Sequence, residues 1–576
     1  MSIEHRVSNI RVIIGLFATL LVVFLALAAR CFYLQYFKNE HFSAVCDRQQ
    51  QAVATLKPQR GAILDCRGRV LAASREIQTV FVEPRILRDA KETSNDLAPV
   101  LDMGAHIICK AITDSANPGF AKIKVGIDQD QAAAAQKIFG AGVESDWQRQ
   151  YPMGLLAPHV VGFTSIDNRG LTGLELEYDK DLAGRVGKNV FIADARRRPI
   201  RLKEHIADVA DGVGIILTLD ATIQQFARAE LLRQYKDYRA ESAVAIVAEP
   251  KTGAILALVS LPDFDPEHFN TADPNNLRNR AITDQFEPGS LIKPIVMAVA
   301  LDEKVVNLTE TIFCENGNYC GKGFGCIGEY REGFGDLTIR NVLVKSSNIG
   351  MAKIGQRMGK DKLYNGLRMF GFGKETGLDL PGETPGLLWP PQKWTGYSVT
   401  RIPFGQEITV TAMQLVNAFC ILANGGHTIR PHIVKAVVDN EGNIVKLTQA
   451  TPPVGFCVDP KVAKWIVTEA MTGVINEGTG KRAKLKKWQV FGKTGTANIA
   501  KTGERGYSEN NYVASFIAGA PAEDPAVIVL VSIRKPDKSL GKGYTGGAVA
   551  SPVAAKILEK TLTYLENRQP QLLAAK

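Results

Sequence analysis

The sequence predicts an α+β fold, and three observations support that prediction. Apolar segments at 243–248 and 254–259 flank a turn, and a second such pair lies at 513–520 and 526–533. Helical patterns fill the region between the two pairs, and an amphipathic helix is predicted at about 552–565. Because strands lie at both ends of this region, we expect one antiparallel sheet of sequence-distant segments, with flanking helices and a helical subdomain.

Length and composition indicate a globular chain with more than one domain. The 576 residues are too many for one hydrophobic core. The contents of 45% hydrophobic and 22% charged residues are ordinary for a folded protein. The net charge is +10, but no run of Lys and Arg carries interleaved aromatic residues. We therefore expect no nucleic-acid partner and a basic surface that suits acidic wall or lipid polymers.

An apolar segment near the N-terminus predicts a membrane anchor. Residues 12–29 carry no charge, and residues 32–34 are again apolar. This length suits one bilayer crossing, so we expect a tail at 1–11 and a single transmembrane helix at 12–34. A cleaved signal peptide is the alternative, because residues 26–28 look like a cleavage site, although the apolar run is long for such a peptide.

Only three of the nine cysteines cluster in the sequence, and they are Cys314, Cys320 and Cys326. A disulfide that closes a small loop and a set of unpaired thiols are both compatible with this spacing. Zinc is disfavoured, because neither a C-x-x-C pair nor a nearby His supplies the usual ligands. We expect no metal and no cofactor.

Three short motifs contain the candidate catalytic residues. Ser290 and Lys293 are three positions apart, and a helix starting at Pro288-Gly289 would place both on one face, one turn apart. An alcohol beside an amine that can take its proton is an activated nucleophile. S-x-x-K is common by chance, however, and a serine at a helix start is usually only a cap. The S-x-x-K motif therefore indicates a catalytic serine only if the other residues of an active site are also present.

The other two motifs follow at domain-scale distances. Ser346-Ser347-Asn348 is predicted in a loop between helices, and Lys493-Thr494-Gly495-Thr496 in a strand whose glycine allows a close approach by a substrate backbone. The order S-x-x-K, S-x-N and K-T-G is the signature of penicillin-recognising serine acyltransferases. Over nearly its whole length the chain resembles the class B penicillin-binding proteins, the monofunctional peptidoglycan D,D-transpeptidases.

Motifs before the catalytic region strengthen the resemblance. Residues 60–65 and 149–175 resemble the family's motifs for a non-catalytic pedestal, including R-G-x-I-x-D and R-x-Y-P. Pattern alone predicts a hairpin here, with its turn at Arg67-Gly68. We expect His159 to bond a loop carbonyl and Glu175 to be a helix-surface or inter-domain carboxylate. The resemblance implies an elongated pedestal at 45–233 and a transpeptidase/β-lactamase-like domain at 234–570.

The resemblance also implies a mechanism. Ser290 would attack the carbonyl between the two terminal D-alanines of a stem peptide and form an acyl-enzyme. Lys293 would be the base, with its pKa lowered by desolvation and by the second cation, Lys493. Ser346 would relay a proton to the leaving amine, and backbone N–H groups of Ser290 and Thr496 would form an oxyanion hole. Asn348 would hydrogen-bond the peptide, and Lys493 and Thr494 would bind its terminal carboxylate. The substrate-binding residues would be Thr494, Gly495 and Thr496.

Partners and alternatives follow from the same resemblance. We expect peptidoglycan stem peptides and β-lactams as ligands, a bacterial cytoplasmic-membrane location with the catalytic domain outside, and a role in septal wall synthesis. A separate glycan polymerase and other membrane proteins of the division complex are the expected protein partners. The alternatives are an elongation- or sporulation-type transpeptidase, a serine β-lactamase or D,D-carboxypeptidase, and a non-catalytic scaffold that kept the fold.

Overall fold

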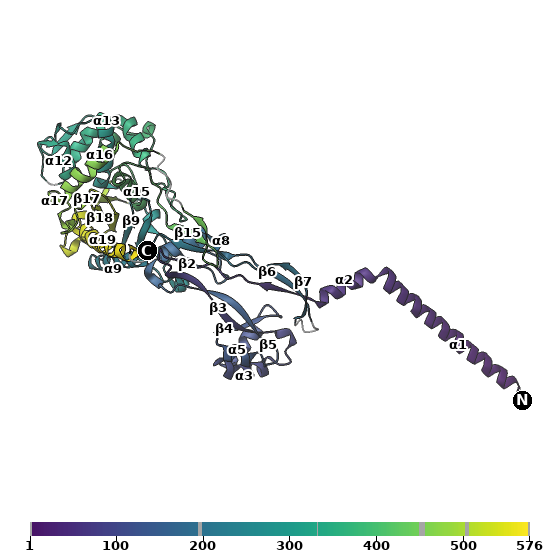
Figure 1. Ribbon diagram of the computed structural model, residues 1–576. Helices are drawn as coiled ribbons and strands as arrows, with labels where there is room; N and C mark the ends of the chain where they lie inside the picture. The colour runs from purple at the N-terminus through teal and green to yellow at the C-terminus, as the bar shows by residue number, and fades with distance from the viewer. Residues whose placement is uncertain (1–2, 194–198, 331, 449–454, 502–505, 574–576) are drawn as a thin grey trace. The chain divides into compact units, whose positions relative to one another are not determined.

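The computed structural model describes residues 3–193, 199–330, 332–448, 455–501 and 506–573. The chain forms two compact units, each discontinuous in sequence (Figure 1). The first consists of Met1–Pro58, Ile77–Asp146 and Arg185–Ala210. The second consists of Gln59–Glu76, Trp147–Gly184 and Asp211–Lys576. Segments of the predicted pedestal therefore occur in both units.

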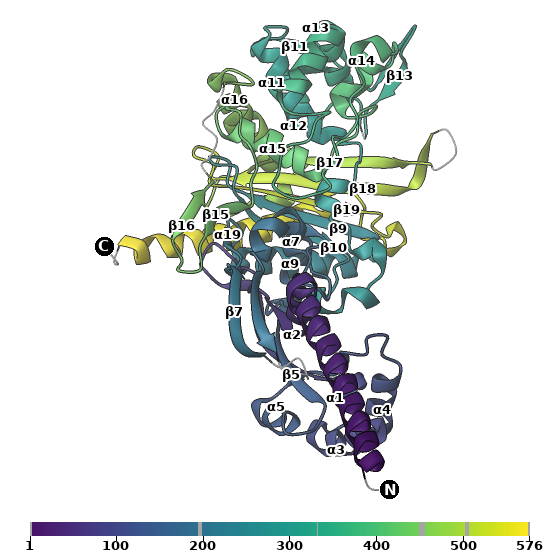
Figure 2. The same ribbon diagram turned by 90° about the vertical axis from the view of Figure 1, so that its right-hand side faces the viewer.

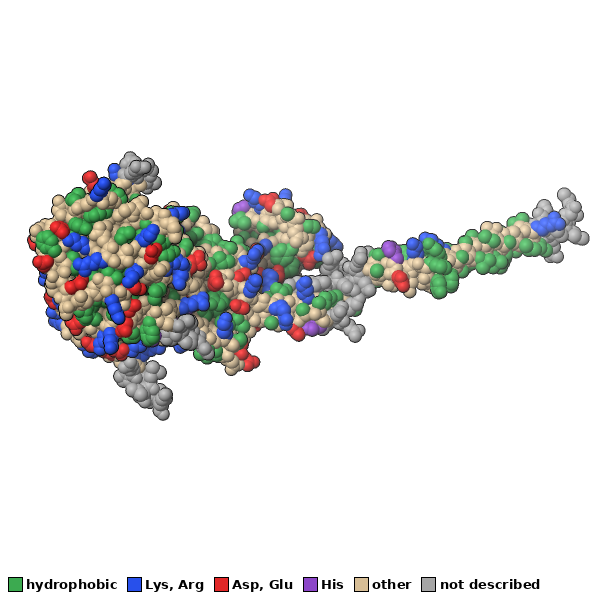
Figure 3. All heavy atoms as spheres, turned by 90° about the horizontal axis from the view of Figure 1, so that it is seen from above, with side chains coloured by type: hydrophobic (Ala, Val, Ile, Leu, Met, Phe, Trp, Pro, Cys, Tyr) green, Lys and Arg blue, Asp and Glu red, His purple; other side chains and the backbone are tan. Residues whose placement is uncertain are grey.

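The first unit begins with the predicted apolar helix. It comprises α1 (Ile3–Phe32), a π-helical turn η1 (Tyr33–Phe37) and α2 (Asn39–Gln50). The span Ile10–Phe37 is long and apolar enough to cross a membrane. Its side chains are exposed, and Figure 3 shows apolar side chains over this helix. Such exposure of a long apolar helix is what a lipid-facing segment requires.

The rest of the first unit is a three-stranded sheet and a small α/β layer. The sheet has the order β1 (Gln51–Leu56), β6 (Gly187–Ala193) and β7 (Pro199–Ala207), all antiparallel. In the α/β layer β3 (Val70–Val82) pairs with β4 (Ala121–Ile127) and β5 (Ala141–Gln150). Its helices are α3 (Ala90–Leu101), α4 (Ala105–Thr113) and α5 (Gln129–Ala135). They bury a core that includes Val80, Val82, Leu97, Leu101 and Ile108.

In the second unit the predicted hairpin is confirmed. The strand β2 (Ile63–Leu64) pairs antiparallel with the start of β3, and the Asp65 carboxylate accepts the N–H groups of Arg67 and Arg69 in the turn. Next to β2 lie β8 (Gly214–Leu217), β15 (Val434–Val438) and β16 (Ile444–Leu447).

A buried charge cluster joins three motifs of the second unit. Glu175, in α7 (Gly173–Glu177), pairs with Arg60 and with Arg149, both at 2.6 Å, and all three side chains are buried. The prediction of a helix-surface carboxylate is therefore wrong for Glu175, because two guanidinium groups neutralise it inside the protein. His159 bonds the Asn276 carbonyl at 2.7 Å as predicted, and burial lowers the pKa of His159 to about 4.

The predicted α+β fold is confirmed by an antiparallel five-stranded sheet in the order β10-β9-β19-β18-β17. Its strands are β9 (Ser242–Ala248), β10 (Ile255–Leu261), β17 (Phe491–Ala500), β18 (Tyr507–Ala520) and β19 (Val527–Arg534). Alternate residues of β9 lie in two different hydrophobic cores. Val244 and Ile246 belong to one core, and Ala245 and Val247 belong to the other. Because both faces of the sheet are buried, these strands are continuous apolar segments in the sequence.

Helices cover both faces of this sheet (Figure 2). One face packs against α9 (Ala221–Asp237), whose N-terminus is capped by Asp220, and against α19 (Ser551–Leu573). The other packs against α15 (Ala412–Ala423), which leads into the helical subdomain. The principal helices of that subdomain are α11 (Lys293–Asp302), α12 (Ile339–Val344), α13 (Asn348–Met369), α16 (Pro460–Trp465) and α17 (Thr472–Asn476).

Candidate active site

The first motif lies at the predicted helix start. A 3-10 turn, η6 (Gly289–Ile292), carries Ser290 and runs directly into α11, whose first residue is Lys293. Gly289 has a positive φ of 51°, and a Cβ there would lie 3.1 Å from the Thr496 carbonyl oxygen. A glycine therefore lets this turn pack against β17 without strain. Ser290 is half-buried, whereas Lys293 is fully buried.

The second motif occupies the predicted loop between helices, after α12 and at the start of α13. The Ser347 hydroxyl caps α13 by accepting the N–H of Gly350 at 2.9 Å. Ser346 has a φ of 60°, a left-handed backbone conformation that a non-glycine residue adopts only where its surroundings impose it. Ser346 and Asn348 thus lie directly before and directly after Ser347, the residue that caps α13.

The third motif lies on β17, the edge strand of the sheet. Lys493 and Thr494 pair with Ile517 and Phe516 of β18, and no other strand of the described residues pairs with the opposite edge of β17. The Thr494 and Thr479 hydroxyls are hydrogen-bonded at 2.6 Å, and the Thr496 hydroxyl accepts the N–H of Gly546 at 3.1 Å. A free strand edge can accept an extended peptide.

Hydrogen bonds join the three motifs. The Lys293 amine donates to the Ser346 carbonyl at 2.6 Å, to the Asn348 side-chain oxygen at 2.7 Å and to the Ser346 hydroxyl at 3.3 Å. The Lys493 amine donates to the same hydroxyl at 2.8 Å. Among the described residues the Ser290 hydroxyl has no hydrogen-bond partner. The structure therefore brings the motifs together, with Ser290 unbonded.

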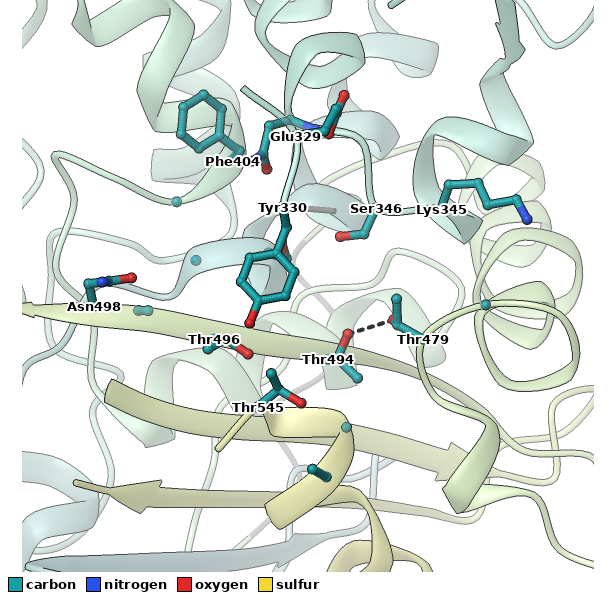
Figure 4. Close-up of a pocket in the computed structure, with 18 of the residues that line it drawn as sticks. Glu329, Tyr330, Lys345, Ser346, Phe404, Thr479, Thr494, Thr496, Asn498 and Thr545 are labelled. Carbon is teal, nitrogen blue, oxygen red and sulfur yellow. Dashed lines mark hydrogen bonds between the residues drawn. The ribbon is translucent and has the colours of Figure 1, made fainter. Parts of the chain in front are cut away.

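A cavity of about 490 Å³ opens over this cluster. Ser290, Ser346, Asn348, Thr494 and Thr496 line it, whereas Lys293, Lys493 and Gly495 are buried and are not among its lining residues. Figure 4 shows the Ser346 side chain above β17, with Thr494 and Thr496 beneath it. Nucleophile candidates thus face the cavity, and the two amines are shielded from solvent.

Burial controls the charges of both lysines. It lowers the pKa of Lys293 to about 7, and the negative charge of Glu329 opposes this effect. Burial also lowers the pKa of Lys493 well below its usual range, and the nearby charge of Lys293 adds to that effect. Desolvation lowers the pKa of Lys293 as predicted, but the second predicted cause, the charge of Lys493, does not contribute. A neutral Lys293 amine is therefore available near neutral pH.

Comparison with known families adds to this geometry. The family described as "Penicillin binding protein transpeptidase domain" matches residues 243–559, more than half of the chain. The family described as "Penicillin-binding Protein dimerisation domain" matches residues 55–217. The chain is a class B penicillin-binding protein.

Relatives of this penicillin-binding protein match it over almost its full length. Stage V sporulation protein D of Bacillus subtilis is 35% identical, covering 97% of this chain and 87% of the relative. Peptidoglycan D,D-transpeptidase FtsI of Escherichia coli K12 is 30% identical, and the match covers 96% of this chain and 92% of that protein. The crystal structure of a peptidoglycan synthetase from Bifidobacterium adolescentis aligns with a TM-score of 0.73 and 26% identity. The alignment covers 90% of this chain and 97% of that one. The crystal structure of penicillin binding protein 3 from Mycobacterium tuberculosis with aztreonam aligns with a TM-score of 0.70 and 25% identity, covering 89% and 97%.

Glu329 is a site residue of this penicillin-binding protein that the sequence motifs did not reveal. Its carboxylate accepts the Ser347 hydroxyl at 2.5 Å and the N–H groups of Asn348 and Ile349 at 2.8 and 3.2 Å. It therefore holds the start of α13, where a negative charge also complements the helix dipole. No short motif marks it, since it lies 17 positions before Ser346 in an irregular segment.

The cysteine cluster lies in the same segment. Cys320 and Cys326 form a disulfide across the hairpin of β12 (Asn318–Gly321) and β13 (Gly325–Gly328), which leads to Glu329. Cys314 is free and buried. The pairing left open by the sequence is thus Cys320 with Cys326. No group of three or more His, Cys, Asp or Glu side chains suited to a metal occurs within the described ranges.

Proposed function

We propose that this class B penicillin-binding protein is a peptidoglycan D,D-transpeptidase that uses Ser290 as nucleophile and Lys293 as general base. The convergence of Ser290, Lys293, Ser346, Asn348 and Lys493 at one cavity carries this proposal. Ser290 forms an ester with the carbonyl of the penultimate D-alanine, and the terminal D-alanine leaves with a proton. A second amine then takes the acyl group and regenerates the Ser290 hydroxyl.

The proton path is supported by the shared contacts of Ser346. Neutral Lys293 accepts the Ser290 proton when donor binding turns the hydroxyl toward the amine, a contact that unliganded sites often lack. Ser346 bonds both amines and passes the proton to the leaving nitrogen. The N–H groups of Ser290 and Thr496 stabilise the oxyanion, at about 3–4 kcal/mol per donor.

The cellular role proposed here is septal wall synthesis from the outer face of the bacterial cytoplasmic membrane. The apolar span Ile10–Phe37 supports a single-pass anchor. The match to FtsI of Escherichia coli, at 30% identity, supports the division role. A separate glycan polymerase among the membrane partners is proposed from the family resemblance alone. A sporulation-specific role is the second candidate, because Stage V sporulation protein D is 35% identical over 97% of the chain. Depletion separates them: filaments without septa indicate division, and normal division with defective spores indicates sporulation.

Labelling with a fluorescent penicillin tests the activity. The full-length protein in detergent is expected to carry one adduct, mapped to Ser290 by peptide mass spectrometry. Ser290→Ala is expected to lose the adduct, while Ser539→Ala, an exposed serine outside the cavity, keeps it. An adduct on another residue would refute the assignment. Rapid release of the hydrolysed β-lactam would instead identify a β-lactamase.

A further inference from the structure

One loop of the second unit carries exposed aromatic side chains. We name residues 387–401 the aromatic loop; it ends in α14 (Ser398–Arg401; Figure 2). It contains Trp389, Trp394 and Tyr397, and thus two of the five tryptophans of the chain. Trp389 is 46% exposed and Tyr397 is 41% exposed. Large aromatic side chains that stay exposed in one segment are typical of a binding site, because a bound ligand would bury them.

Contacts within the aromatic loop hold these rings in place. The Trp394 indole N–H donates to the Trp389 carbonyl at 2.6 Å. The Lys393 amine lies 4.3 Å from the centre of the Trp389 ring, and the Arg401 guanidinium lies 5.0 Å from the centre of the Tyr397 ring. A cation thus covers one face of each ring, and the exposed remainder is available to a ligand. Lys393 is exposed and makes no ion pair within the described ranges, so its N–H groups can donate to that ligand.

Hydrogen bonds attach the aromatic loop to one end of the active-site cavity. The Ser398 hydroxyl donates to the Glu407 carboxylate at 2.6 Å, and the Glu407 N–H donates to the Glu287 carboxylate at 3.0 Å. The Arg401 guanidinium donates to the side-chain oxygen of Gln406 at 3.4 Å. Glu287 and Gln406 both line the cavity. The aromatic loop therefore adjoins the cavity at these two residues.

This end of the cavity lies away from the Thr494 end of β17. The Tyr507 hydroxyl donates to the Glu287 carboxylate at 3.0 Å, and Tyr507 pairs with the last residue of β17. Asn498, near that end of the strand, also lines the cavity, and Figure 4 shows Asn498 and Thr494 on opposite sides of Thr496. A ligand that lies along the edge of β17 from Thr494 to Asn498 is therefore directed toward the aromatic loop.

The donor strand is a ligand with this direction. This step rests on the proposed function and on the expected binding of the terminal carboxylate by Lys493 and Thr494. With the reacting carbonyl at Ser290, the rest of the stem peptide extends past Asn498. About three residues separate that carbonyl from the sugar that carries the peptide, which is about 10 Å of extended chain. The sugar therefore emerges at the end of the cavity that adjoins the aromatic loop.

We propose that the aromatic loop is a glycan-binding site that holds the donor strand by its N-acetylated sugars, with Trp389 and Tyr397 as the stacking residues. A pyranose ring has a face of C–H bonds, which stacks on an indole or a phenol ring. Its hydroxyl and acetamido groups accept hydrogen bonds from an amine such as that of Lys393. A glycan-linked donor therefore uses the aromatic loop, and a free stem peptide does not.

Binding of peptide-free glycan tests the site. The full-length protein in detergent is first acylated with penicillin, which blocks the cavity, and glycan oligosaccharides freed of peptides by an amidase are then titrated. We expect a shift of tryptophan fluorescence and a heat of binding in calorimetry. W389A/Y397A is expected to weaken binding at least about tenfold. Trp488→Ala is the matched control, because the Trp488 ring also has a lysine over it, Lys487 at 4.9 Å, and lies outside the loop and the cavity lining. Absence of binding to the wild type would overturn the proposal.

Donor kinetics test whether the site serves the reaction. Release of D-alanine is measured with uncross-linked glycan strands that carry stem peptides, and with the free stem peptide. We expect kcat/KM per peptide to be about tenfold higher for the glycan-linked donor, through a lower KM. W389A/Y397A is expected to use both donors equally and to keep its penicillin adduct.

Three outcomes separate the proposals. An undiminished preference of W389A/Y397A for the glycan-linked donor would overturn the glycan-binding site. Binding of a protein partner that requires Trp389, without binding of glycan, would assign the loop to that partner and also overturn it. Loss of penicillin labelling in the wild type would overturn the proposed function itself.

Discussion

The Lys493 amine donates a hydrogen bond to the Ser346 hydroxyl at 2.8 Å. This contact connects the edge strand of the sheet to the loop before α13, from segments 147 positions apart. The hydroxyl also accepts from Lys293 at 3.3 Å, so one oxygen lies between two buried amines. Two ammonium groups in such a place repel each other, which favours loss of a proton from the pair.

The pH dependence of acylation follows from Lys293. Burial lowers the pKa of Lys293 to about 7, and a general base must be neutral. The second-order rate of β-lactam acylation is therefore expected to rise with pH through about 7. Lys293→Arg, which stays charged, is expected to lose acylation by at least about 100-fold. Stopped-flow labelling from about pH 5.5 to about pH 8.5 measures both; a flat profile in the wild type would count against Lys293 as base.

Glu329→Gln is expected to shift that profile. The Glu329 charge raises the pKa of Lys293, so its removal moves the midpoint to lower pH. Loss of a carboxylate acceptor for Asn348 also loosens α13 and slows acylation at its plateau. The matched control is Glu332→Gln, an exposed residue of the same segment. A slower plateau with an unmoved midpoint would assign Glu329 a purely structural role.

Lys293→Met is expected to stabilise the protein while abolishing acylation. The pKa of Lys293 is about 7 when folded and 10.5 as the ordinary value, so the unfolded chain binds more protons between these pH values. The stability of the wild type therefore rises with pH across this interval. Because the variant lacks the buried amine, its free energy of unfolding is expected to exceed that of the wild type by roughly 1–3 kcal/mol at neutral pH. This difference shrinks as the pH rises toward the ordinary lysine pKa. Thermal unfolding at several pH values measures the difference, and a destabilised variant at neutral pH would contradict it.

Arg60→Ala is expected to destabilise the second compact unit. Glu175 is fully buried and would keep only Arg149 as its guanidinium partner. Breaking a buried ion pair on one side costs about 3–5 kcal/mol. Differential scanning calorimetry measures the loss, and Arg185→Ala, outside this cluster, serves as control. A loss below about 1 kcal/mol would mean that Arg149 and solvent compensate for Arg60.

Deletion of residues 1–37 is expected to release the protein from membranes. The deleted segment holds the apolar span Ile10–Phe37, and none of its residues lines the cavity. Fractionation and fluorescent-penicillin labelling are expected to find the truncated protein in the soluble fraction with its Ser290 adduct intact. Retention in washed membranes would point to a second means of attachment.

Ordered motifs and apolar runs in the amino-acid sequence predict much of the fold and of the site. The strand pairs at β9–β10 and β18–β19 are predictable because both faces of the sheet are buried, which leaves long uninterrupted apolar segments. Ser290, Ser346 and Lys493 are identifiable because their chemistry needs fixed neighbours within a few residues.

The residues that escape prediction depend on tertiary contacts. Glu329 acts through backbone N–H groups of α13, and any carboxylate at the right point in space could do so; no local pattern marks it. The burial of Glu175 depends on Arg60 and Arg149, which lie 115 and 26 positions earlier. Helix periodicity alone carries no information about such partners.

The left-handed backbone of Ser346 limits the evolutionary routes open at this position. Threonine would conserve the hydroxyl, yet a β-branched side chain is poorly tolerated at a φ of 60°. Glycine suits the conformation but removes the oxygen that both amines share. A bacterial population under selection by an inhibitor that contacts Ser346 would therefore gain resistance through neighbouring cavity positions, leaving this serine unchanged.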